Sequence, residues 1–428
     1  MKFITRFSPN SRIRLAAFAA ALLCALPLPP SGYAAPAELT YEKPQLLKAS
    51  YLLPPNIVAG DLFRVGDQVS TEMYMGHFTL YSDVGTFEVS GENLLKIRIA
   101  ELPAIRQLDS MSKSKEFLAA AGNAAVKPVK SAVNMVENPV ETVKGIPSGL
   151  SRFFDRVGSG IKSIANSATD SDSTAGEKGA NTAGRVGDFT ITALGFEDSR
   201  RQLAQDLAVD PYTTNTILAD KLTNMAWVTF SGKLGVNTLV SVFVPVSIAI
   251  SGTAFTNDLV YNTTKSDLII KNREMMLDIG GSETLADTLL GNRWYSLTVL
   301  TSLLTGLESL SKVEGRSQLL ELATKAASEE EARFVAATVQ MLARMNGTKV
   351  SLAKVSARGT VVGIARNGAI VVPAPVDYLS WTKQIALLAQ RQDLRAPHRS
   401  IWLTGKISTR AREGFEALGW TINRAAPL

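Results

Sequence analysis

Hydrophobic and polar positions repeat with two different periods near the start of the chain. On both sides of Ser82-Asp83-Val84-Gly85, residues 77–81 and 86–90 alternate between apolar and polar, which predicts two antiparallel strands joined by a turn. From Glu92 the apolar positions recur every three or four residues, at Leu95, Ile99, Leu102, Ile105 and Leu108. This spacing gives a helix one apolar stripe, although Pro103 within it removes a backbone hydrogen bond.

Residues 139–165 form the most regular amphipathic segment. Apolar positions follow the helical period, and Arg152, Arg156 and Lys162 occupy the other side. Such a helix can lie on an anionic membrane surface or pack on its own domain. Several glycines weaken it as a free helix, so the sequence favours packing. The candidate membrane-facing residues of the first interpretation are Phe153, Phe154, Val157 and Ile161.

Residues 189–347 are mainly helical in pattern. Asp210-Pro211 is expected to end one helix and begin the next, and further helices are predicted over 266–278, 282–290 and 295–310. Ser328 followed by Glu331 is a capping box that opens a helix running to Met345, and Asn346-Gly347 supplies a left-handed end.

One stretch inside this region has a period of two. β-branched residues occupy every even position from Val240 to Ile250, and no charged residue occurs between Lys233 and Asp258. Residues 234–257 therefore form a core strand, a core helix or a membrane segment. The sequence favours a buried core element. The alternative is a membrane-inserting hairpin over 236–255, because such hairpins show the same alternation.

The last part of the chain, residues 348–428, mixes strand and helix patterns. Asn367-Gly368 lies between two apolar segments, 360–365 and 369–372, and predicts a hairpin turn. Helices are predicted over 381–390 and 409–418, the second capped by Ser408 and ended by Gly419. Strands are predicted over 400–404 and 420–422.

Residues 166–188 divide the chain. They contain mostly Ser, Thr, Asp, Gly, Ala and Asn, and cannot bury enough apolar surface to offset the entropy of ordering them, so we expect a disordered linker or loop. The predicted fold class is α+β, mainly helical. The predicted parts are an N-terminal α+β region with amphipathic helices at 35–165, which starts with an extended arm at 35–55, a mainly helical domain at 189–347 and a small basic α+β module at 348–428.

The first 34 residues have the pattern of a secretory signal peptide. Four cations and no acid precede the apolar run Leu15–Leu28, and small residues follow. This run is shorter than the about 20 residues of a membrane-spanning helix. We expect cleavage after Ala34 and an exported protein.

Cysteine and charge limit the choice of partners. Cys24 lies in the leader and is the only cysteine, so the exported chain has none with which to form a disulfide.

Residues 349–428 contain 12 Lys and Arg against four acids, whereas the net charge of the whole chain is only +6. This basic end suggests an anionic envelope component or protein as partner, although a solvated basic face explains it as well. Nucleic acid is not expected outside the cytoplasm. The candidate contacts for an anionic partner are Arg399, Lys406, Arg410, Arg412 and Arg424.

The sequence contains no recognisable catalytic, cofactor-binding or metal-binding motif. Its two histidines, His77 and His398, lie far apart, and four Ser-x-x-Lys matches lack the elements that accompany them in penicillin-binding enzymes. We expect no cofactor and favour a protein that is not an enzyme. An envelope hydrolase with an Asp/Glu pair stays open, because two acids can meet from anywhere in a fold.

Scattered segments resemble a family of exported proteobacterial proteins without known activity. They are Gly85–Gly91, Leu95–Glu101, Asn138–Gly145, Trp402–Gly405 and Gly419-Trp420. The resemblance implies a Gram-negative envelope location. We therefore expect a periplasmic or envelope protein with a binding or scaffolding role. A membrane-active or pore-associated protein that uses 145–165 and 236–255 is the alternative.

Overall fold

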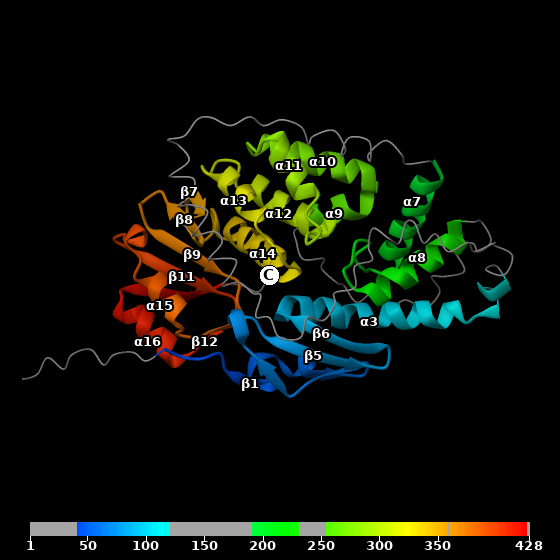
Figure 1. Ribbon diagram of the computed structural model, residues 1–428, viewed down its shortest axis with the longest axis horizontal. Coiled ribbons are helices and arrows are strands. Elements are labelled where there is room, and N and C mark those ends of the chain that lie inside the picture. The colour runs from blue at the N-terminus through cyan, green and yellow to red at the C-terminus, as the bar shows by residue number, and fades with distance from the viewer. Residues whose placement is uncertain (1–40, 116, 120–190, 231–253, 358, 426–428) are drawn as a thin grey trace, which may run out of the picture. The chain divides into compact units, whose positions relative to one another are not determined.

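The computed structural model describes residues 41–115, 117–119, 191–230, 254–357 and 359–425. These ranges contain three sheets and many helices (Figure 1), so the prediction of a mainly helical α+β fold is confirmed. The predicted leader with Ala34, the amphipathic segment 139–165 and the predicted linker 166–188 lie outside the described residues. The same holds for most of the period-two stretch, since description resumes at residue 254.

An antiparallel sheet and one long helix make up the N-terminal part. The sheet has the order β1-β4-β5-β3-β2, and β6 pairs with β5. The predicted hairpin is β5 with β6, and the predicted helix is α3, which continues through Pro103. The elements are β1 (Leu46–Lys48), α1 (Ala49–Leu52), α2 (Pro55–Val58), β2 (Ala59–Gly60), β3 (Phe63–Val65), β4 (Gln68–Ser70), the 3-10 turn η1 (Glu72–Tyr74), β5 (His77–Ser82), β6 (Gly85–Ser90) and α3 (Glu92–Ser112).

The expected extended arm over 35–55 is wrong for its described half. β1 pairs with β4, and Ala49 and Leu53 are 1% and 4% exposed in the core under the sheet. The prolines mark the ends of short elements instead: Pro54 precedes α2, and Pro55 is its first residue, a position that needs no backbone N–H.

The central part is helical, as predicted. Its described helices are α7 (Ile191–Asp206), α8 (Thr216–Phe230), α9 (Ala254–Asn262), α10 (Lys265–Asp278), α11 (Glu283–Leu290), α12 (Leu297–Ser309), α13 (Arg316–Ala323) and α14 (Glu329–Met345). The leucines of α12 pack against α14 in the largest buried cluster. The capping box is present in a shifted form, because Ser328 accepts from the Glu331 backbone N–H while the Glu331 carboxylate accepts from the N–H of Ala327.

One predicted helix start is wrong. The helix expected to begin at Pro211 is α8, which begins at Thr216. The Asp210 carboxylate accepts hydrogen bonds from the backbone N–H of Tyr212 and from the hydroxyl of Thr298, which holds residues 210–215 as a turn. Thr213 and Asn215 in this turn donate hydrogen bonds to Glu101, and Thr214 donates one to Glu329.

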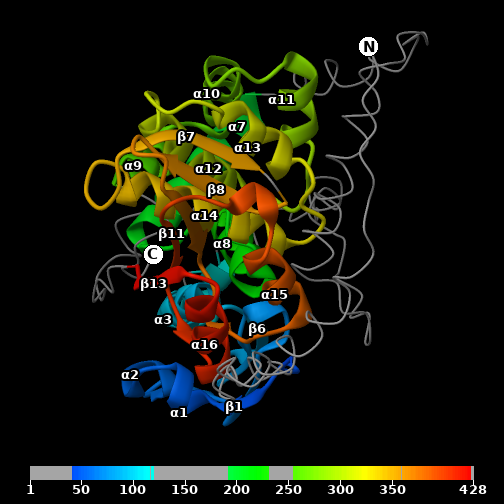
Figure 2. The same cartoon turned by 90° about the vertical axis from the view of Figure 1, so that its left-hand side faces the viewer.

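The C-terminal part is a mixed five-stranded sheet with the order β13-β11-β9-β8-β7, in which β9, β11 and β13 are parallel. Helices α15 and α16 cover one face and α14 packs on the other (Figures 1 and 2). The elements are β7 (Leu352–Ala357), β8 (Val361–Ala365), β9 (Ile370–Ala374), β10 (Tyr378–Leu379), α15 (Lys383–Ala389), the 3-10 turn η4 (Gln392–Leu394), β11 (Arg399–Leu403), β12 (Lys406–Ile407), α16 (Thr409–Ala417) and β13 (Trp420–Arg424).

Candidate functional site

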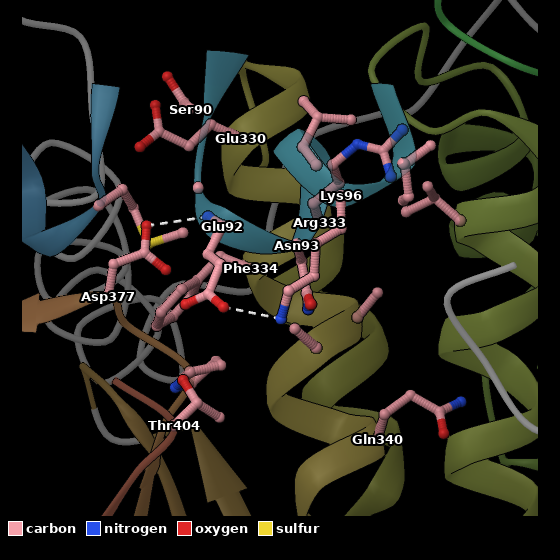
Figure 3. Close-up of a pocket in the computed structure, with 18 of the residues that line it drawn as sticks. Ser90, Glu92, Asn93, Lys96, Glu330, Arg333, Phe334, Gln340, Asp377 and Thr404 are labelled. Atoms are coloured by element: carbon pink, nitrogen blue, oxygen red, sulfur yellow. Dashed lines mark hydrogen bonds and ion pairs between the residues drawn. The ribbon is translucent and has the colours of Figure 1, made fainter. Parts of the chain in front are cut away.

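A cavity of about 130 Å³ lies between α3, α14 and the loops that follow β9 and β11. One water needs about 10–15 Å³ of such volume, so the cavity has room for a small organic group. Its apolar wall includes Met75, Leu94, Val299 and Phe334. Charged and amide side chains from α3, α14 and the loop after β9 complete the lining (Figure 3).

The parallel strands explain why a cavity forms at this edge of the sheet. Residues after the carboxyl ends of parallel strands face open space, where ligands of α/β folds commonly bind. After Ala374 and Leu403 the β9–β11 pair separates, and it resumes as the short parallel pair β10–β12. Gly405 lies in the gap, and a Cβ there would come within 2.2 Å of the Asp377 carbonyl oxygen. This close approach fixes the loop that carries Asp377.

Asp377 connects the C-terminal module to the start of α3. Its Oδ2 accepts hydrogen bonds from the backbone N–H groups of Gly76 at 2.8 Å and Glu92 at 3.1 Å. Glu92 is the first residue of α3, so Asp377 caps this helix from far along the chain. Burial raises the pKa of Asp377 to about 7, against the effect of these two bonds.

Glu330 is the second carboxyl group of the cavity that titrates near neutrality. It lies in the first turn of α14, and its buried Oε1 has no hydrogen-bond partner in the described part of the chain. Burial, together with the charges of Glu331 and Asp377, raises the pKa of Glu330 to about 7. Because Asp377 contributes to this shift, the two carboxyl groups interact, and their protonation is coupled.

Three cations line the cavity, Lys96, Arg333 and Arg344, and the first two form ion pairs with other carboxylates. The Lys96 ammonium lies 2.7 Å from the Glu92 carboxylate, and the Arg333 Nε lies 2.6 Å from a carboxylate oxygen of Glu329. Figure 3 shows Asp377 bonded to the backbone of Glu92, whose carboxylate in turn pairs with Lys96. Within the described residues neither Glu330 nor Asp377 belongs to an ion pair.

Gln340 lies further along α14 at the other end of the cavity (Figure 3). Gln340 is 4% exposed, and its Nε2 donates a hydrogen bond to the backbone carbonyl of Ser302. A carbonyl only accepts, so the amide nitrogen must face Ser302. The amide oxygen is then a buried acceptor without a partner among the described residues.

A buried ion pair lies behind the cavity, on the side of α3 and the 210–215 turn. Arg98 and Glu101 are 6% and 1% exposed, and Nη1 of Arg98 lies 3.0 Å from Oε2 of Glu101. The same carboxylate also accepts from the Thr213 hydroxyl and from the Asn215 amide at 2.8 Å. Every oxygen of Glu101 therefore has a donor.

Glu329 extends this cluster to α14. Its Oε1 accepts from the Thr214 hydroxyl and from Arg333, each at 2.6 Å, and lies 4.0 Å from Arg98. Burial opposes ionisation of Glu329, but the charges of Arg333 and Arg98 and the Thr214 bond outweigh it and lower the pKa. The paired cluster and the cavity thus share the first turn of α14.

The sequence-predicted contacts for an anionic partner are spread over the basic module. Arg399 lies at the amino end of β11, with its guanidinium 5.0 Å from the Trp420 ring centre and a hydrogen bond to the Leu418 carbonyl. Lys406 lies over Tyr51 at 4.1 Å from the ring centre and donates to the Tyr51 carbonyl. Both cations therefore have intramolecular roles.

The remaining candidates lie at the other edge of the sheet. Arg410 and Arg412 are in the first turn of α16, which follows β11 and β12, and Arg424 ends β13 in register with Leu403. Arg412 and Arg424 are exposed. These positions are on the carboxyl side of the parallel strands, whereas Arg399 is on the amino side, so the five candidates do not form one patch.

Other candidates lie apart from the cavity or outside the described residues. The candidate membrane-facing Phe153, Phe154, Val157 and Ile161 are not described. Across the described ranges, no group of three or more His, Cys, Asp and Glu residues is arranged to hold a metal ion. In the same ranges no helix has the length and apolar character needed to cross a membrane.

Sequence reasoning missed the two central residues of the cavity. Glu330 appeared only as part of the helix-opening run, and Asp377 only as one of four acids in a basic module. Neither position carries a local signal, because 46 residues and several elements separate them. The signal in the structure is burial of two carboxyl groups that form no ion pair within the described residues.

Comparison with protein-family models, with curated proteins and with solved structures finds no match to this chain.

Proposed function

We propose that this chain is an exported envelope protein that binds a small organic ligand in the cavity between α3, α14 and the ends of β9 and β11. The observation that carries the proposal is a cavity whose apolar wall lies beside two buried polar atoms, Glu330 Oε1 and Gln340 Oε1, that have no partner among the residues the structure describes. Ligand pockets typically combine a mostly apolar lining with a few polar groups that fix orientation. The predicted leader supports the export part of the proposal.

The test fills the cavity. Ala337 lines it and is half-buried on α14, so Ala337→Trp should place an indole in the cavity. Small organic fragments detected by saturation-transfer NMR should bind the unmodified protein and lose binding in this variant. Ala417→Trp is the matched control, because Ala417 is an exposed alanine of α16. Fragments that bind both variants equally, or a protein that binds none, would contradict the proposal.

A hydrolase is the second candidate, and one observation favours it. Glu330 and Asp377 have pKa values raised to about 7 in one cavity, which suits a general acid and base at neutral pH. Hydrolysis of a panel of chromogenic glycosides and esters should then fall by about 100-fold or more in Glu330→Gln. A panel without turnover by the unmodified protein would leave binding as the function.

The other proposals rest on the sequence alone. An anionic envelope partner would use the exposed Arg412 and Arg424 with Arg410. Replacing the three with Gln should weaken retention on anionic vesicles, and unchanged retention would count against it. A membrane-active role through 145–165 and 236–255 would cause leakage of such vesicles, and inert vesicles would dismiss it.

A further inference from the structure

Two polar side chains of the cavity have an oxygen without a partner among the described residues, and both oxygens are acceptors. Glu330 presents a carboxyl oxygen and Gln340 an amide oxygen, and both atoms are buried. A buried acceptor is stable only when a donor reaches it. The matching ligand therefore carries N–H or O–H donors rather than further acceptors.

The charge of the cavity selects among donors. Lys96 and Arg333 each form an ion pair with another carboxylate, Glu92 and Glu329. Asp377 accepts two backbone N–H groups, which leaves its negative charge without a paired cation among the described residues. A cationic donor gains charge-assisted hydrogen bonds at these carboxyl groups that a neutral hydroxyl does not.

The spacing along α14 sets the shape of the ligand. Glu330 and Gln340 are ten residues apart on one helix, which corresponds to about 15 Å along its axis. Phe334 and Ala337 line the cavity between them, and Val299 of α12 also contributes to its wall. One end of the cavity is thus acidic, its middle is apolar, and its far end offers the Gln340 amide acceptor, with Arg344 also in the lining one turn further along α14.

We propose that the ligand is an elongated organic ammonium ion, with its cationic head at Glu330 and Asp377, an apolar body along α14, and a second donor within reach of Gln340. This inference rests on the proposed binding function and names the class of its ligand.

The test compares three probes that share one tail: n-hexylamine, 1-hexanol and hexanoate. Isothermal titration calorimetry should give the order hexylammonium, then hexanol, then hexanoate, from tightest to weakest. A carboxyl group with a pKa of about 7 is about a tenth ionised at pH 6 and about nine-tenths at pH 8, while an alkyl ammonium stays protonated. Hexylammonium affinity should therefore rise about tenfold from pH 6 to pH 8, and hexanol affinity should stay constant.

The charged groups around Glu330 are Glu331 and Arg333 on α14, Glu92 and Lys96 on α3, and Asp377 on the loop after β9. Glu330→Gln keeps the shape and removes the charge. It should lower hexylammonium affinity at pH 8 by about fivefold or more, reduce its pH dependence to the part that Asp377 contributes and leave hexanol binding unchanged.

Glu413→Gln, at an exposed glutamate of α16, is the control and should change nothing. Hexanol or hexanoate binding as tightly as hexylammonium, with no pH dependence, would overturn the ammonium proposal and leave the binding function standing. If all three probes fail to bind and the cavity-filling test also finds no fragment, the binding function itself fails.

Discussion

Two consecutive glutamates at the start of α14 have opposite electrostatic surroundings. Glu329 accepts hydrogen bonds from Thr214 and Arg333, and its pKa is lowered. Glu330 lines the cavity with an oxygen that has no partner within the described ranges, and its pKa is raised to about 7. Burial acts on both, so partners rather than burial decide the direction of the shift. A fold that pairs one carboxylate and leaves its neighbour unpaired separates a structural group from a candidate binding group.

The largest expected effect is a loss of stability when the buried Arg98–Glu101 ion pair is broken. Arg98→Met leaves Glu101 buried without its cation, and losing one partner of a buried ion pair costs about 3–5 kcal/mol. Arg106→Met is the control on the same helix, because the Arg106–Asp83 pair is 54% and 51% exposed and should contribute less than about 1 kcal/mol. Urea unfolding measures both. Equal losses would show that the buried cluster does not hold α3 to the 210–215 turn.

The next effect concerns the cap that Asp377 supplies to α3. Asp377→Ala leaves the N–H groups of Gly76 and Glu92 without an acceptor and should cost about 2–4 kcal/mol. Asp377→Asn retains one carbonyl oxygen, so its cost in the same urea experiment should be below about 1 kcal/mol. Similar losses in both variants would mean that the charge, rather than the hydrogen bonds, stabilises this contact.

The smallest expected effect is a gain in the free energy of unfolding, whereas the preceding variants lose stability. The pKa of Glu330 is about 7 in the fold and about 4.5 in the unfolded chain, so the folded state binds more protons between these values. Stability conferred by the protonated group is present at low pH and is lost as pH rises from about 4.5 to about 7. Glu330→Gln should therefore match the unmodified protein near pH 4.5 and exceed it by about 1–3 kcal/mol at pH 8.

Thermal unfolding at the two pH values checks this gain, because both proteins are compared in the same buffers. A variant that is less stable than the unmodified protein at pH 8 would show that Glu330 has a partner in solution. In that case the contrast with Glu329 would disappear.

Local sequence patterns predicted many of the helices and strands, but they did not predict the contacts between residues that are far apart in the sequence. The β5–β6 hairpin, α3, α14 and the Ser408 cap follow from periodicity and capping residues that act within a few positions. β7 and α13 were not expected. β1 was missed because its three residues carry no alternating pattern and its stability comes from pairing with β4. The 210–215 turn depends on Thr298, which lies 88 residues from Asp210.

The cavity could not be predicted for the same reason. Asp377 caps a helix that begins 285 residues earlier, and Glu330 meets it only because α14 packs on the face of the sheet that ends in the Asp377 loop. In the sequence Glu330 is part of the acidic run that opens α14, and Asp377 is one of four acids in a basic module. Their raised pKa values depend on burial and on the absence of a nearby paired cation, which are properties of the assembled fold.

Carboxyl-detected ¹³C NMR titration of Glu330 tests the central claim most directly. In the unmodified protein the Glu330 carboxyl should titrate with a pKa of about 7, and in Asp377→Asn the pKa should be lower because the neighbouring charge is removed. A Glu330 pKa near 4.5 that does not respond to Asp377→Asn would contradict the account, because the cavity would then hold no uncompensated carboxyl pair.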